Sequence, residues 1–156
     1  LEPAARQVGI KLALENLPTP GHMELLVKLF GEYPADFLGL CYDSGHGNMA
    51  GNGIELLETL LAGETVSRLA AMHLHDNHGE SDLHLPPFRG SIDWERLMGI
   101  IARAYRAGYS KPLCLECSIR HSSFERSRRG ESEFLQESLQ AGRRIEELKE
   151  LACGAD

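Results

Sequence analysis

The sequence predicts an α/β fold with a parallel sheet, because short apolar runs alternate with amphipathic segments along the whole chain. The apolar runs are nearly continuous rather than alternating with polar residues, which is typical of strands buried on both faces. A complete eight-unit barrel needs about 250 residues. The 156 residues therefore allow half of a (β/α) barrel or a small open sheet, and we expect one α/β domain over residues 1–156.

Four apolar runs are expected to form the strands, and residues that favour turns separate each run from the next segment of the chain. The second run, for example, is followed by Gly45 and Gly47, which are expected to end the strand. The expected strands cover residues 9–15, 37–43, 70–76 and 112–117. The polar stretches at residues 77–90 and 118–130 are expected to be loops.

Apolar residues at helical spacing predict a helix after each strand. The first helix is expected to end near Gly31, and a continuation of the second through Val66 and Leu69 stays open. Asp93 is a suitable N-cap for the third helix, and Gly108 suits its C-terminal end. The four expected helices cover residues 23–30, 54–61, 94–105 and 134–148.

The composition narrows the classes of function. The chain has 16 basic and 23 acidic residues and a formal net charge of −7, which disfavours a broad nucleic-acid-binding face. No apolar run approaches the roughly 20 residues of a membrane span. The first residues carry no apolar signal core, and the four cysteines have no metal-finger spacing. We therefore expect a cytoplasmic protein with reduced thiols.

A side chain able to bind a metal ion or to move a proton stands at the end of each predicted strand. These residues are Glu15, Asp43, His73 and Glu116. Parallel α/β folds place their active sites at the carboxyl ends of the strands. The residue two positions earlier shares the same face of its strand, and in every strand it is small: Ala13, Cys41, Ala71 and Cys114. The intervening residues are large and are expected to pack against the helices: Leu14, Tyr42, Met72 and Leu115.

Three carboxylates that converge in one cavity repel one another, and a divalent cation removes this cost. Two Glu, one Asp and one His suit Mn²⁺, Co²⁺, Mg²⁺ or Zn²⁺ without choosing among them. Any single one of these carboxylates could equally cap a helix or accept a hydrogen bond from a loop, so the inference depends on all four residues together. His75 shares a face with His73 and is expected to line the same cavity.

Several stretches of the chain resemble the xylose-isomerase-like TIM-barrel superfamily, which includes sugar isomerases, sugar epimerases and endonuclease IV. These stretches are LALENLP (12–18), CYDSGH (41–46), MHLHDN (72–77), SDLHLP (81–86) and LCLEC (113–117). They occur in the order of strands five to eight of the family's barrel and cover nearly the whole chain. The resemblance therefore implies the C-terminal half of a TIM barrel, with strands one to four absent.

The resemblance also implies roles for individual residues. Glu15, Asp43, His73 and Glu116 would bind one divalent metal ion. His46 corresponds to a position that binds substrate in the epimerases and a second metal ion in the endonuclease. Asp82 and His84 correspond to a D-x-H motif that holds a further metal ion in the endonuclease and also occurs in sugar-isomerase-like members. Substrate contacts are expected from His46, His75 and Arg89, although Arg89 has no clear counterpart and the alternative of a solvated loop arginine is favoured for it.

The implied activity is that of a metal-dependent sugar isomerase or epimerase. Glu15 and Glu116 would transfer protons next to a carbonyl, through an enediolate. The alternatives are an abasic-site phosphodiesterase similar to endonuclease IV and a non-catalytic metal-binding fragment that needs a partner half. The expected partners are a small sugar or sugar derivative, and either a second copy of the chain or a complementary N-terminal half that pairs with the open sheet edges. Neither a membrane nor a nucleic acid is expected as a partner.

Overall fold

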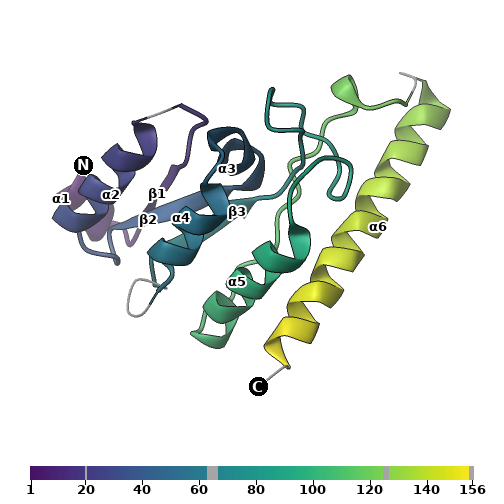
Figure 1. Ribbon diagram of the computed structural model, residues 1–156. Coiled ribbons are helices and arrows are strands. Elements are labelled where there is room, and N and C mark those ends of the chain that lie inside the picture. The colour runs from purple at the N-terminus through teal and green to yellow at the C-terminus, as the bar shows by residue number, and fades with distance from the viewer. Residues whose placement is uncertain (20, 63–66, 125–126, 155–156) are drawn as a thin grey trace.

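The computed structural model describes residues 1–19, 21–62, 67–124 and 127–154 and contains a three-stranded parallel sheet (Figure 1). Its strands are β1 (Leu12–Glu15), β2 (Leu38–Asp43) and β3 (Leu69–His73), in the order β1-β2-β3. The α/β class and three of the predicted strands are thereby confirmed, each strand being shorter than predicted. The open continuation of the second helix does not reach Leu69, which begins β3, and Val66 lies outside the described residues.

Residues 112–117 run parallel to the chain just beyond β3, but they make a single bridge, between Leu74 and Leu115. The backbone of Leu74 donates one hydrogen bond to this segment over 2.8 Å and accepts one over 3.0 Å. The prediction of a full strand is therefore wrong, although the neighbour and the direction are those expected. The pairing stays short because Ser118, the next residue along, donates its N–H to His84 of the preceding loop instead (2.7 Å).

Four helices follow the predicted pattern and differ from it at their ends. They are α2 (His22–Glu32), α4 (Gly53–Leu60), α5 (Trp94–Arg106) and α6 (Arg128–Cys153). Asp93 caps α5 as predicted, because its carboxylate accepts the N–H of Arg96 (3.0 Å). Helix α2 continues past Gly31, and the expected loop at 118–130 contains both the start of α6 and a 3-10 turn, η2 (Ile119–His121). Among the described helices, none is long and apolar enough to cross a membrane.

Two short helices, α1 (Glu2–Gln7) and α3 (Ser44–Ala50), have no counterpart in the sequence pattern. Gly45 and Gly47 suggest a break after β2, yet both lie inside α3. Their lack of a side chain is needed for packing: a Cβ on Gly45 would lie 2.0 Å from Cε1 of His75, and a Cβ on Gly47 would lie 3.1 Å from the Cα of Gly53, at the start of α4. Helix propensity disfavours glycine, so tertiary contact decides the structure of this segment.

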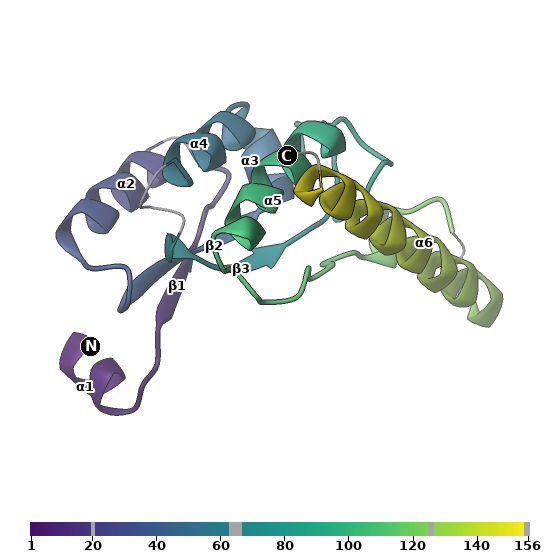
Figure 2. The ribbon, with the colours of Figure 1, turned by 90° about the horizontal axis from the view of Figure 1, so that it is seen from below.

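Helices α2, α4 and α5 lie along one face of the sheet (Figure 2). Tyr42 and Met72 point to this face and are 1% exposed, as their position in the strand pattern predicts. On the opposite face Ala13 and Cys114 are exposed, and Cys41 is buried. A parallel sheet with helices outside and small residues on an open inner face is consistent with part of a TIM barrel.

Candidate metal centre

The four residues at the strand ends gather around one imidazole nitrogen. Nδ1 of His73 lies 2.9 Å from Oε2 of Glu116, 3.4 Å from Oε2 of Glu15 and 4.0 Å from Oδ2 of Asp43. Glu15, Asp43 and His73 are the last residues of β1, β2 and β3, and Glu116 follows the bridge at Leu115. Parallel strands bring their carboxyl ends to one edge of the sheet, so the shared centre follows from the topology.

The charges at this centre are not balanced by the protein groups around it. Nδ1 of His73 is buried and has no hydrogen-bond partner among the described residues, although three carboxylates approach it. A buried group of this kind is costly unless something pairs with it. Ligand atoms of Asp43, His73 and Glu116 lie within 4.8 Å of one another, as do those of Glu15, Asp43 and His46. Oxygen and imidazole donors in this arrangement fit a divalent cation.

Asp43 is the most firmly held of the four. Its side chain is fully buried, and Oδ1 accepts the backbone N–H of His46 (2.7 Å). Nε2 of His75 lies 3.1 Å from Oδ1 and 3.2 Å from Oδ2. Burial alone would raise the pKa of the Asp43 carboxyl, but the hydrogen bonds from His75 and His46 outweigh it and lower this pKa. Asp43 is therefore ionised and oriented by its neighbours.

Asn16 fixes the spacing between the ends of β1 and β2. Its side chain, 0% exposed, donates to the carbonyl of Asp43 (2.8 Å) and accepts the N–H of Asp43 (2.7 Å). Glu15 is the last residue of β1 that pairs with β2 through the backbone. The side chain of Asn16, the next residue, takes the place of a further backbone pair. Sequence reasoning missed Asn16, because an asparagine next to a strand end is an ordinary turn residue.

A second group of polar side chains adjoins the first. Oδ2 of Asp82 lies 3.1 Å from Nε2 of His84 and 3.4 Å from Nε2 of His46. His46 also connects the two groups, because its Nδ1 lies 3.0 Å from Oε1 of Glu15. Ligand atoms of Asp82, His84 and His75 lie within 4.8 Å of one another. The D-x-H residues and His46 therefore meet in space, and their role as metal or substrate ligands stays a prediction.

His84 supports this second group and also touches the first. Its Nδ1 lies 2.7 Å from the backbone carbonyl of Glu116, and its φ is 49°, in the left-handed region that a histidine rarely adopts. Burial lowers the pKa of His84, but the hydrogen bond to Glu116 and the charge of Asp82 outweigh it and raise this pKa. The contacts of the ring with Glu116 and Asp82 place it between the loop and the segment that carries Glu116.

Two other predicted residues lie differently. His75 is 0% exposed, and its ring faces Asp43 and His84. Arg89 is exposed and forms an ion pair with Glu137 of α6. A substrate contact from either residue stays a prediction.

The loop that carries Asp82 is closed at its base by Asp76. The backbone of Asp76 donates to and accepts from Leu85 over 2.8 and 2.9 Å. The Asp76 carboxylate accepts the indole N–H of Trp94, the first residue of α5 (2.8 Å). Asp76 therefore anchors the loop, and among the described residues no hydrogen bond or ion pair joins its carboxylate to an imidazole.

The chain belongs to the xylose isomerase-like TIM barrel family, whose members it matches over residues 1–145. It is 34% identical over 144 residues to the uncharacterized protein y4fM of Sinorhizobium fredii, covering 90% of this chain and 42% of that protein. It is 31% identical over 121 residues to the uncharacterized protein MJ1311 of Methanocaldococcus jannaschii, covering 72% of this chain and 38% of that one. The chain thus spans less than half the length of these curated relatives.

Two solved structures share the fold. A D-tagatose 3-epimerase-like protein superposes with a TM-score of 0.66 at 24% identity, covering 95% of this chain and 50% of that one. A xylose isomerase domain protein from Alicyclobacillus acidocaldarius superposes with a TM-score of 0.67 at 23% identity, covering 98% of this chain and 55% of that one. At this level of identity the similarity shows the fold alone.

Proposed function

We propose that the chain is the C-terminal, metal-binding half of a divalent-metal-dependent sugar isomerase or epimerase, made of barrel strands five to eight. The observation that carries the proposal is the approach of three carboxylates, from Glu15, Asp43 and Glu116, to Nδ1 of His73, which accepts or donates no hydrogen bond within the described part of the chain. Mn²⁺, Co²⁺, Mg²⁺ and Zn²⁺ are all compatible with this set of donors. The cation would supply Lewis acidity next to a substrate carbonyl.

The two glutamates are the candidates for proton transfer. Glu15 and Glu116 come from opposite ends of the sheet order, with His73 between them. Their side chains are 31% and 46% exposed, so both can reach a small molecule in the open inner face. One would take the proton next to the carbonyl of a sugar and the other would return it, through an enediolate. Asp43 is fully buried and would act as a ligand only.

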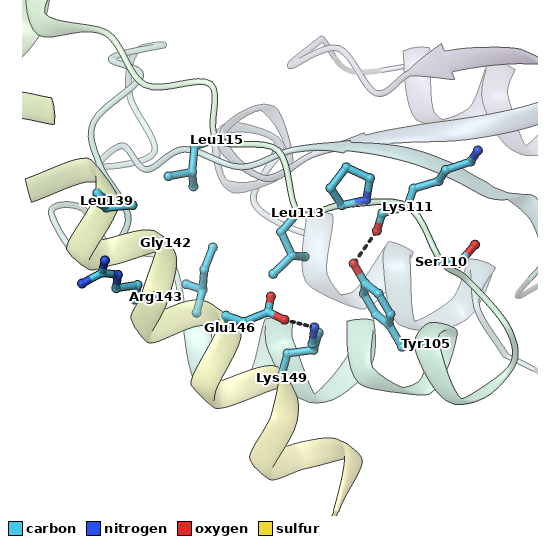
Figure 3. A pocket seen from close by; sticks show the side chains of 12 residues that line it. Tyr105, Ser110, Lys111, Leu113, Leu115, Leu139, Gly142, Arg143, Glu146 and Lys149 are labelled. Carbon is cyan, nitrogen blue, oxygen red and sulfur yellow. Dashed lines mark hydrogen bonds and ion pairs between the residues drawn. The ribbon is translucent and has the colours of Figure 1, made fainter. Parts of the chain in front are cut away.

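A complementary N-terminal half is the partner that we propose for this chain. A groove of about 600 Å³ lies between α6 and the segment that contains Leu113 and Leu115. Figure 3 shows the side chains of both leucines directed towards α6. Leu139 of α6 lines its opposite wall. In a closed barrel this is the position of the first β/α unit, and the solved structures are about twice as long as the region that the chain matches.

Metal binding is the first test. The full chain is titrated with each of the four cations by isothermal calorimetry, alongside His73→Ala and, as a matched control, His78→Ala. His78 is exposed, in the loop after β3. We expect the control to bind as the native chain does and His73→Ala to bind at least about 10-fold more weakly, because a ligand is lost. Absence of binding to the native chain contradicts the proposal.

Proton exchange is the second test. The metal-loaded chain, alone and mixed with a separately produced N-terminal half, is incubated with a panel of ketoses in D₂O. Deuterium uptake next to the carbonyl, read by NMR, is expected for at least one sugar in at least one of the two preparations. Metal binding with no uptake in either preparation would contradict the isomerase proposal and favour a non-catalytic metal-binding role.

The meeting of His46, Asp82 and His84 keeps an endonuclease-like function as a second candidate. Such a function needs several metal ions and a surface that accepts a polyanion, whereas the net charge is −7. Cleavage of a duplex that contains one abasic site, together with binding of more than one ion per chain, would support it. Absence of cleavage by the metal-loaded chain, with and without the N-terminal half, would exclude it.

The cytoplasmic location of the protein stays a prediction.

A further inference from the structure

His75 is a fully buried imidazole, and neither proton transfer of the proposed reaction uses it. We propose that His75 is a positioning residue, which holds the Asp43 carboxylate in the orientation of a metal ligand and connects it to His84. This inference rests on the proposed function, because it concerns the same centre. Its support comes from the hydrogen bonds of the ring, from the packing of the ring and from the fit of the surrounding backbone.

His75 is the side chain that donates a hydrogen bond to the carboxylate of Asp43. Nε2 of His75 lies 3.1 and 3.2 Å from the two oxygens of Asp43, and both side chains are 0% exposed. Carboxylate oxygens only accept hydrogen bonds, so Nε2 carries the proton and donates it. The other hydrogen bond to the Asp43 carboxylate, among the described residues, comes from the backbone N–H of His46 (2.7 Å). Without His75, the buried carboxylate of Asp43 would lose the only side chain among the described residues that donates a hydrogen bond to it.

The ring of His75 is fixed from several sides. It stacks on the ring of His84, with centroids 4.0 Å apart and 13° between the planes. On the side of α3, a Cβ on Gly45 would lie 2.0 Å from Cε1 of His75, so only glycine leaves room for the ring. Ser44 locks the backbone as well: its Oγ donates to the carbonyl of His75 (2.7 Å) and accepts the N–H of His75 (3.0 Å).

The second ring nitrogen of His75, Nδ1, indicates why this position carries a histidine. Nδ1 of His75 is buried and has no hydrogen-bond partner among the described residues. A buried polar atom without a partner has a cost, and a purely apolar ring of similar shape would avoid it. The histidine is therefore explained by what Nε2 does for Asp43, and not by packing alone. Partners of this kind, which orient the residues that bind a metal, typically change metal affinity by 10–100-fold when they are lost.

Two substitutions separate the hydrogen bond from the packing. His75→Gln keeps an N–H donor of similar reach, and His75→Phe keeps a flat ring on His84 without the donor. Mn²⁺ affinity is measured by electron paramagnetic resonance of the free ion, with His78→Phe as the control on an exposed histidine. We expect His75→Phe to bind about 10–100-fold more weakly, and His75→Gln to recover most of that loss.

Equal affinity of His75→Phe and the native chain, or a larger loss in His75→Gln than in His75→Phe, would overturn the inference. Circular dichroism and thermal unfolding show whether each variant is folded. If neither variant folds, the native chain still decides the matter, because long-range ¹H–¹⁵N NMR reports which imidazole nitrogen carries the proton. Protonation of Nε2 supports the inference and protonation of Nδ1 alone overturns it. A native chain that binds no metal contradicts the proposed function itself, which is a separate result.

Discussion

Oε2 of Glu116 lies 2.9 Å from Nδ1 of His73, although a single backbone bridge joins the segments that carry the two residues. The side chain of Glu116 is 46% exposed, and its backbone carbonyl contacts Nδ1 of His84 at 2.7 Å. Glu116 is therefore placed by loop contacts as much as by sheet pairing. Its carboxylate contributes to the centre while contributing little to the packing of the fold.

A Glu116→Gln substitution should accordingly weaken metal binding and leave stability nearly unchanged. The amide lacks the charge that attracts a cation, so we expect at least a roughly 10-fold loss of Mn²⁺ affinity. The free energy of unfolding should change by no more than about 0.5 kcal/mol, as for most exposed positions. Glu80→Gln, at an exposed loop residue, is the matched control. Equal affinities of the two variants would remove Glu116 from the ligand set.

Asn16→Ala should destabilise the fold. The substitution leaves the backbone N–H and carbonyl of Asp43 without their partners in a buried site, which costs about 1–3 kcal/mol for each group of this kind. Urea unfolding measures the difference. Asn52→Ala is the control, because Asn52 is exposed and makes no side-chain capping hydrogen bond. If both variants unfold at the same urea concentration, Asn16 does not hold the two strand ends together.

Gly53→Ala should destabilise the contact between α3 and α4. The added Cβ would lie 2.2 Å from the Cα of Gly47, and backbone cannot move aside as a flexible side chain can. Overpacking of this kind costs about 1–3 kcal/mol. Gly31→Ala provides the comparison: no atom lies within 4 Å of a Cβ there, and alanine favours helices by up to about 1 kcal/mol. Thermal unfolding should therefore shift in opposite directions for the two variants, and a shared direction would contradict this explanation of the helix contact.

The decrease in the free energy of unfolding at acid pH should depend on Arg103. Hydrogen bonds from Arg103 and Arg96 of α5 lower the pKa of Glu58 on α4 below its ordinary value of 4.5. A lowered carboxyl pKa stabilises the fold above pH 4.5, and this contribution disappears as the pH falls through the lower, folded-state pKa. Arg103→Ala should raise the pKa of Glu58 towards 4.5, as measured by NMR titration of its carboxyl carbon. Arg120→Ala, on η2, should leave that pKa unchanged.

The sequence predicts the strand ends well because their residues obey strand geometry. Alternation along a strand places Tyr42 and Met72 on the helix-covered face, and the carboxyl ends of parallel strands meet whatever the loops do. The convergence of Glu15, Asp43 and His73 needs no more information than this. The local sequence pattern is sufficient to predict the direction of a side chain wherever a single strand or helix determines it.

The features that sequence reasoning missed depend on contacts between segments distant in the chain. Helix α3 forms because glycines allow it to pack against α4 and His75, which no local propensity records. Residues 112–117 fail to form a strand because Ser118 bonds to His84 of another loop. The position of His75 between Asp43 and His84 likewise requires knowledge of three separate segments.

The bond between Asp76 and Trp94 has a consequence for how the protein can vary. Trp94 is 3% exposed within the hydrophobic interior, yet its indole holds the base of the loop that presents Asp82 and His84. Two backbone hydrogen bonds between Asp76 and Leu85 join the ends of this loop, so the position of its base constrains the residues between them. Substitutions in the interior around Trp94 would then shift the positions of Asp82 and His84 without contacting them. The geometry of the second polar group can therefore change during evolution through residues of the hydrophobic core.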